Sequence, residues 1–111
     1  MPNVRHRSFG EWFDQPSDAT DYLTLLKTMW ASDWFDNTDL ILYQAGVDCH
    51  VDDPLGGVLT TEEMRLRDRM MFEGAKKRGI PLVFNLAGGY QTPVSKVVSL
   101  HVNTMEECLT I

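Results

Sequence analysis

Two apolar runs with a helical segment between them constrain the fold of this chain most. Residues 40–44 and 80–86 are predominantly apolar, which is typical of buried strands. Thr60 and Glu63 have the spacing of a capping box at the start of the intervening helix, and Gly79 suits its left-handed C-terminal residue. Strands joined by a helix pair in parallel through a right-handed crossover. The sequence therefore predicts an α/β fold, with a small parallel β-sheet flanked by helices.

Two further helices are predicted outside this unit. Residues 20–32 place Leu23, Leu26 and Trp30 on one helical face. A last helix begins near Pro93, because proline suits the first helical turn. We expect its apolar stripe to face the core, and the stripe consists of Val94, Val97, Val98, His101, Val102, Met105 and Cys108.

Two strands are few for a parallel sheet, which normally has more strands and is covered on both faces. Residues 1–17 have no clear period and are predicted to be irregular, although a short strand over residues 4–8 would extend the sheet. The alternative is that another chain completes the sheet. The length of 111 residues fits one domain, so residues 1–111 are predicted to form a single unit.

The charge and the cysteine content narrow the choice of partners and of location. A formal net charge of −6 argues against nucleic-acid binding, which needs a basic patch, and against binding to anionic membranes. We recognise no signal peptide, and no apolar run approaches the ~20 residues that span a bilayer. Two cysteines do not make a disulfide framework. We therefore expect a cytoplasmic protein with free thiols and with neither nucleic-acid nor membrane partners.

Residues able to do chemistry follow both predicted strands. Asp48 and His50 come after the first strand, and Gly88, Gly89 and Tyr90 come after the second. Open α/β sheets place their chemistry at the carboxyl ends of their strands. Because parallel strands end at the same edge of a sheet, these two segments are predicted to lie side by side.

The same two segments carry a family resemblance. The sequences AGVDCHVDDPLG (residues 45–56) and LAGGYQTPV (residues 86–94) resemble the superfamily of zinc-dependent histone deacetylases and acetylpolyamine amidohydrolases, in particular its bacterial members. The similarity extends over about residues 17–108. It implies that the chain is a fragment, the C-terminal portion, of the family's three-layer α/β/α fold.

The resemblance also implies roles for individual residues. In the family pattern Asp48 would be a zinc ligand, and Gly88 and Gly89 would bring backbone close to the substrate channel. Tyr90 would be catalytic and would donate its hydroxyl to the carbonyl oxygen of the scissile amide. Zinc, the implied cofactor, activates a water molecule and polarises that carbonyl, and a phenol can stabilise the negative oxygen that forms.

The chain departs from the family pattern in its histidines. Family members carry a histidine pair and an Asp-x-His pair upstream of the region that this chain resembles. Its own histidines are His6, His50 and His101, and none of them matches those pairs. A catalytic zinc usually needs three protein ligands, and the resemblance supplies one, so zinc is predicted to be absent or partial. A separate metal site that uses Asp48 with His50 is a weaker alternative.

Several of these residues also have ordinary structural interpretations. Asp48 would then cap a turn, while Asp52 and Asp53 would organise the loop through bonds to backbone amides. Cys49 and His50 do not suggest a nucleophile and its base, because adjacent residues of an extended segment point in opposite directions.

Three functional hypotheses remain. The first is a truncated deacetylase-like protein that is not catalytically competent alone and forms a homo-oligomer, because apolar surface would otherwise meet water. The second is a zinc-dependent amidohydrolase that is reconstituted with a complementing chain or with another copy. The third is a binding module that holds a small ligand or a peptide in the residual crevice.

Overall fold

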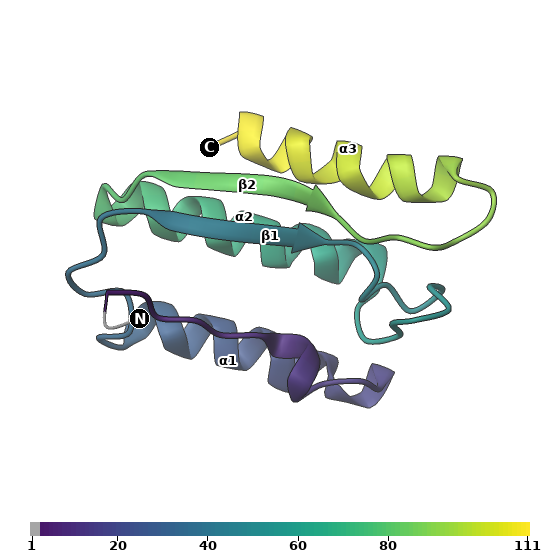
Figure 1. The fold of residues 1–111 in the computed structure, drawn as a ribbon, viewed down its shortest axis with the longest axis horizontal. Coiled ribbons are helices and arrows are strands. Elements are labelled where there is room, and N and C mark those ends of the chain that lie inside the picture. The colour runs from purple at the N-terminus through teal and green to yellow at the C-terminus, as the bar shows by residue number, and fades with distance from the viewer. Residues whose placement is uncertain (1–2) are drawn as a thin grey trace.

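The computed structural model describes residues 3–111 and shows three α-helices and two strands in the predicted order (Figure 1). Two short 3₁₀ turns, Phe9–Glu11 and Pro16–Asp18, precede them. The elements are α1 (Ala19–Ala31), β1 (Ile41–Gly46), α2 (Thr61–Arg78), β2 (Leu82–Ala87) and α3 (Ser95–Leu109). The α/β fold class is therefore confirmed.

The strands β1 and β2 pair in parallel, as predicted. Ile41 lies opposite Leu82, and the register continues to Gly46 opposite Ala87. The capping box is also present, since the Thr60 hydroxyl accepts the Glu63 N–H and the Glu63 carboxylate accepts the Thr60 N–H. α2 ends at a left-handed Gly79, also as predicted.

The strand suggested over residues 4–8 does not form, so the sheet has two strands within residues 3–111. Contacts with α1 and with the loop after it hold the N-terminal segment away from the sheet. Phe9 packs on Tyr22 of α1 with ring centroids 4.6 Å apart, and the Arg5 guanidinium donates to the backbone oxygens of Trp34 and Asp36. Burial of the Phe9 ring replaces strand pairing as the interaction that orders the segment.

The sheet is covered on one face only. Figure 1 shows the two strands in front of α2, with α1 and α3 on either side and no helix over the near face. On the covered face Ile41 is buried, and Tyr43 reaches Phe72 of α2 with ring centroids 6.0 Å apart. On the open face Leu42 is 77% exposed, and its neighbour Val83 is 57% exposed. One of the two faces of this sheet is therefore exposed to solvent.

Buried side chains form two clusters. The first gathers around the loop after β1 and consists of Ala19, Tyr22, Val47, Val58, Leu59, Met64, Val97 and Leu100. The second lies near the start of β1 and consists of Leu26, Met29, Phe35, Ile41, Met71 and Ala75. The loop between β1 and α2 thus contributes to the core, which gives the residues around Asp48 a rigid base.

The prediction for the last helix is confirmed for Val97 and is wrong for most of the other stripe residues. Within α3 the buried residues are Val97, Leu100, Thr104 and Glu107, whereas Val94, Val98, Val102, Met105 and Cys108 of the expected stripe are exposed. α2 supplies the reason, because it offers partners for the polar side chains of α3. The Asp68 carboxylate accepts the Thr104 hydroxyl at 2.6 Å, and Arg69 pairs with Glu107 at 2.8 Å.

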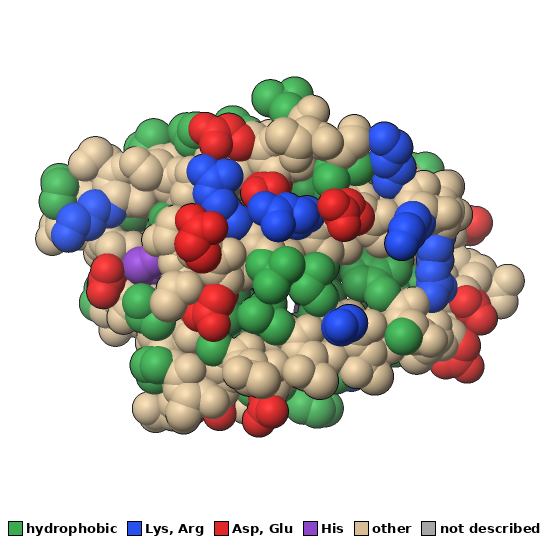
Figure 2. Space-filling view, turned by 180° about the vertical axis from the view of Figure 1, so that it is seen from behind, with side chains coloured by type: hydrophobic (Ala, Val, Ile, Leu, Met, Phe, Trp, Pro, Cys, Tyr) green, Lys and Arg blue, Asp and Glu red, His purple; other side chains and the backbone are tan. Residues whose placement is uncertain are grey.

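Charged side chains join α2 and α3 on the side of the molecule away from the open sheet face. Besides the Arg69–Glu107 pair, Arg65 pairs with Glu106 at 3.0 Å. Figure 2, a view from behind, shows acidic and basic side chains next to one another across this helical face. None of the helices within residues 3–111 is long and apolar enough to cross a bilayer.

Candidate functional site

The Asp48 carboxylate lies against the glycine turn that follows β2. A Cβ atom placed on Gly88 would be 2.8 Å from the Asp48 Cγ, and one placed on Gly46 would be 3.2 Å from its Oδ1. Gly88 also has a φ of 65°, a conformation that favours glycine. The two segments that follow the strands are therefore neighbours, which confirms the inference from parallel topology.

Tyr90 follows this turn and is open to solvent. Tyr90 is 53% exposed. The preceding Gly89, in contrast, is packed so closely that an added Cβ would be 2.8 Å from a Val47 methyl group. The backbone N–H of Tyr90 donates to the Asp53 carboxylate at 2.8 Å. Asp48 and Tyr90 thus stand on one edge of the sheet, on two segments that contact each other.

His50 has a structural role in this structure. It is 6% exposed, its Nδ1 accepts the Asp52 backbone N–H at 3.0 Å, and its Nε2 lies 2.9 Å from the Thr61 hydroxyl oxygen. An accepting Nδ1 leaves the ring proton on Nε2, from which it can be donated to Thr61. Both ring nitrogens are therefore engaged, and His50 holds the loop to the start of α2.

The donors present do not fit a catalytic zinc. Within residues 3–111 no group of three His, Cys, Asp or Glu side chains is arranged to hold a metal ion. The side-chain hydrogen bonds of the loop involve Cys49, His50 and Asp53, and none within the described part of the chain uses the Asp48 carboxylate. Asp48 is thus a single free carboxylate, where a catalytic zinc needs about three protein ligands.

A buried ionic network beneath the end of β1 escaped the sequence reasoning. Arg67 and Asp68 of α2 are 3% and 1% exposed. The Arg67 guanidinium donates to the Gly46 carbonyl at 2.7 Å and to the Asp68 carboxylate at 3.1 Å. The other Asp68 partners are the hydroxyls of Tyr43 and Thr104. The network joins β1, α2 and α3 directly under the segment that carries Asp48.

A sequence signal for this network exists. Arg67 and Asp68 lie three and four residues after the buried Met64. The buried Met71 and Phe72 in turn lie three and four residues after Asp68. Residues at these spacings share one face of a helix. Charged residues in the middle of an otherwise apolar face indicate a buried pair, because an unpaired buried charge is too costly.

Burial also shifts the pKa values of two residues next to this network. Burial raises the pKa of Tyr43 well above its usual value; Arg67 opposes this shift, and the Asp68 carboxylate adds to it. Burial likewise raises the pKa of the Cys49 thiol, although Arg67 opposes the shift. A raised pKa disfavours the thiolate form of Cys49, the form that acts as a nucleophile.

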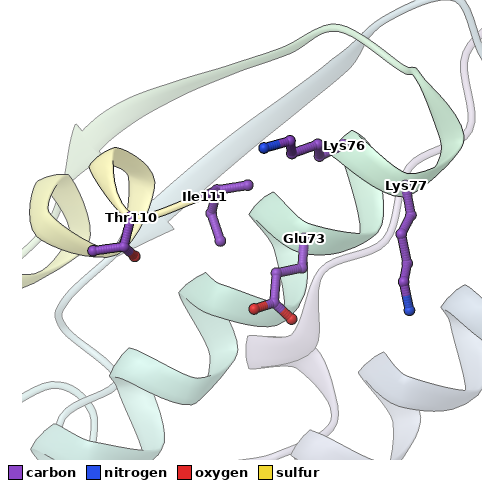
Figure 3. A pocket seen from close by; sticks show the side chains of 5 residues that line it. All are labelled: Glu73, Lys76, Lys77, Thr110 and Ile111. Carbon is purple, nitrogen blue, oxygen red and sulfur yellow. The ribbon is translucent and has the colours of Figure 1, made fainter.

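An open pocket of about 450 Å³ lies elsewhere, beside the last turns of α2 and α3 (Figure 3). Its lining comes from Glu73, Lys76, Lys77, Thr110 and Ile111. None of these residues belongs to the segments around Asp48 and Tyr90. The pocket therefore does not enlarge the site that the sequence predicts.

Comparison with known proteins supports the family resemblance of the sequence. The pattern that describes the histone deacetylase domain matches residues 11–105. The chain is 34% identical over 62 residues to Histone deacetylase 2 of Arabidopsis thaliana, an alignment that covers 55% of this chain and 16% of the relative. It is also 34% identical over 64 residues to an uncharacterized protein of Picosynechococcus sp., with 57% and 21% covered. The aligned region thus spans less than a quarter of each relative, and the chain itself belongs to the histone deacetylase domain family.

Proposed function

We propose that this truncated histone-deacetylase-like chain does not catalyse deacetylation alone and that it self-associates. The observation that carries the first part is the donor set, with Asp48 as a single free carboxylate and His50 engaged by its own loop. A bound zinc would supply an activated water and a polarised carbonyl, but one carboxylate does not hold a catalytic zinc. Tyr90 then remains as a phenol on an exposed turn.

The open sheet face supports the second part of the proposal. Leu42 and Val83 are neighbours on this face, and Gln44 and Asn85 continue it without charge. An uncharged face lets two copies approach although each carries a net charge of −6. Burial of apolar surface contributes about 25 cal/mol per Å². We therefore propose that a second copy covers this face and supplies the missing layer.

Sedimentation at micromolar concentration tests self-association. The parent chain is expected to sediment with a mass above that of one chain. Leu42→Lys places a charge in the middle of the open face and should shift the protein to the monomer. Leu55→Lys is the matched control, because Leu55 is 71% exposed but lies in the loop after β1. A parent chain of single-chain mass would refute this part of the proposal.

A second candidate is a zinc-dependent amidohydrolase that is completed by another chain or another copy. The observation in its favour is that Asp48 keeps a free carboxylate beside the turn that carries Tyr90. If copies complement one another, the purified protein should contain zinc and turn over an acetyl-lysine reporter, and Tyr90→Phe should abolish that turnover. Metal-free protein that stays inert after zinc is added would contradict this version.

The proposed location is the cytoplasm. Cys49 is half-buried and Cys108 is exposed, and neither forms a disulfide within the described residues. Free thiols are usual in a reducing compartment. This supports the location that the sequence predicts.

A further inference from the structure

Asp53 is a buried carboxylate that joins the two segments of the site. It is 6% exposed; its Oδ1 accepts the Leu55 backbone N–H at 2.9 Å, and its Oδ2 accepts the Tyr90 backbone N–H at 2.8 Å. The backbone of Asp53 is itself held, because its N–H donates to the His50 carbonyl at 3.0 Å. The Asp53 carboxylate is therefore held in place by its own loop and accepts a hydrogen bond from a residue 37 positions further along the chain.

Packing holds the two glycines of the turn against Asp48 and Val47, but Tyr90 itself has few other contacts. Gly88 and Gly89, which precede it, have φ values of 65° and 106°, in the region that glycine visits freely. Within residues 3–111 the Tyr90 ring stacks on no other aromatic ring, and its phenol makes no hydrogen bond to a side chain. The hydrogen bond from the Tyr90 N–H to Asp53 thus anchors the backbone from which the Tyr90 ring projects.

A carboxylate suits this position better than an amide. Each Asp53 oxygen receives one N–H, so both oxygens act as acceptors. An asparagine would turn its own NH₂ group toward one of these donors. Hydrogen bonds to a charged acceptor are also the stronger kind.

We propose that Asp53 is a positioning residue, which sets the place of Tyr90 relative to Asp48. The use of Tyr90 in chemistry rests on the second candidate function, the reconstituted amidohydrolase, but the anchor itself does not. Both residues belong to the edge where β1 and β2 end, so the loop that carries Asp48 also determines the orientation of the Tyr90 turn.

Amide hydrogen exchange, followed by NMR, tests the anchor. In Asp53→Ala the Tyr90 amide should exchange about tenfold faster or more, because a charge-assisted bond of about 1.5–3 kcal/mol is lost and each 1.4 kcal/mol is a factor of ten. The proton resonance of that amide should also move upfield. Asp53→Asn keeps one acceptor oxygen, so an intermediate acceleration is expected. Asp52→Asn is the control, since Asp52 is exposed and bonds neither Leu55 nor Tyr90.

A merely structural role would give a different result. Loss of overall stability would accelerate the Ile41 amide, which bonds the Pro81 carbonyl at the other end of the sheet, by the same factor as the Tyr90 amide. Equal acceleration at both amides, or unchanged exchange at Tyr90, would overturn the proposal. If Asp53→Ala does not fold, the comparison is made with Asp53→Asn. The experiment needs neither zinc nor turnover, so its outcome is independent of the reporter test of Tyr90→Phe.

Discussion

Removal of the Asp68 carboxylate should be among the most damaging single changes in this protein. The carboxylate is 1% exposed and accepts hydrogen bonds from Arg67, Tyr43 and Thr104. In Asp68→Ala the Arg67 guanidinium stays buried without its counter-charge, and two buried hydroxyls lose their acceptor. The chain cannot simply expose Arg67, because the guanidinium is also bound to the Gly46 carbonyl.

The expected magnitude follows from these contacts. Breaking a buried ion pair by removing one partner costs about 3–5 kcal/mol. The two hydroxyl bonds that are lost add about 1 kcal/mol each at most, because contributions within one network do not add fully and the Thr104 hydroxyl keeps the Leu100 carbonyl as an acceptor. The free energy of unfolding of a domain of this size is about 5–15 kcal/mol. Asp68→Ala should therefore remove a large fraction of it, with a midpoint lower by about 2 M urea.

Urea unfolding at a fixed protein concentration measures this effect. Tryptophan fluorescence is a suitable signal, because Trp30 stacks on the buried Phe35 with ring centroids 3.8 Å apart. The concentration must be held constant, since association would shift the apparent stability. Arg67→Met combined with Asp68→Ala is the critical comparison. The double variant should be more stable than Asp68→Ala alone, because it leaves no unpaired buried charge.

Two outcomes would refute this reasoning. An Asp68→Ala midpoint equal to that of the parent would mean that the network contributes little to stability. A double variant less stable than Asp68→Ala would mean that Arg67 stabilises the fold mainly through its bond to the Gly46 carbonyl and not through charge balance with Asp68. Either result would also weaken the view that this network supports the segment that carries Asp48.

Two further predictions concern the glycine turn and the helix pair. Gly88→Ala and Gly79→Ala share a φ of 65°, but an added Cβ at Gly88 meets Asp48 at 2.8 Å and one at Gly79 meets nothing. Backbone strain should lower the free energy of unfolding of both variants by about 1–2 kcal/mol, and overpacking should lower that of Gly88→Ala by about 1–3 kcal/mol more. Equal decreases in the Tm of the two variants would contradict the close contact at Gly88. Hydrogen bonds from Arg69 lower the pKa of Glu107 below its ordinary value of 4.5, so its carboxylate stabilises the fold above that pH. Glu107→Gln should therefore lower the Tm at neutral pH, and the difference should vanish as the pH falls through the folded-state pKa; a difference independent of pH would exclude the charge as its cause.

Much of the fold follows from local patterns in the sequence. Thr60 and Glu63 define the start of α2 because the capping box needs only residues three apart, and Gly79 defines its end by its own backbone freedom. Parallel pairing follows from the length of the helical connection between the strands. From that topology alone, Asp48 is expected beside Gly88, and the structure places them in contact.

The rotation of α3 and the fate of residues 4–8 did not follow from local patterns. The stripe containing Val98 and Met105 satisfies every periodicity rule, yet it faces solvent because Thr104 and Glu107 bind Asp68 and Arg69. Periodicity states which residues share a helical face, but the partner helix decides which face is buried. Residues 4–8 remained unpaired for a similar reason, since packing on α1 was available to them and no sequence pattern measures that competition.

The same distinction between local sequence pattern and tertiary packing applies to the candidate site. By itself the sequence determined which chemical groups reach the edge where β1 and β2 end, because strand order and a family pattern both reside in the order of residues. Only the tertiary structure decided the state of each group: His50 engaged at both nitrogens, Asp53 bound to the Tyr90 amide, and Asp48 left free. The physical reason is that a hydrogen bond depends on ångström-scale distances between atoms far apart in the chain, and these distances exist only after the helices have packed.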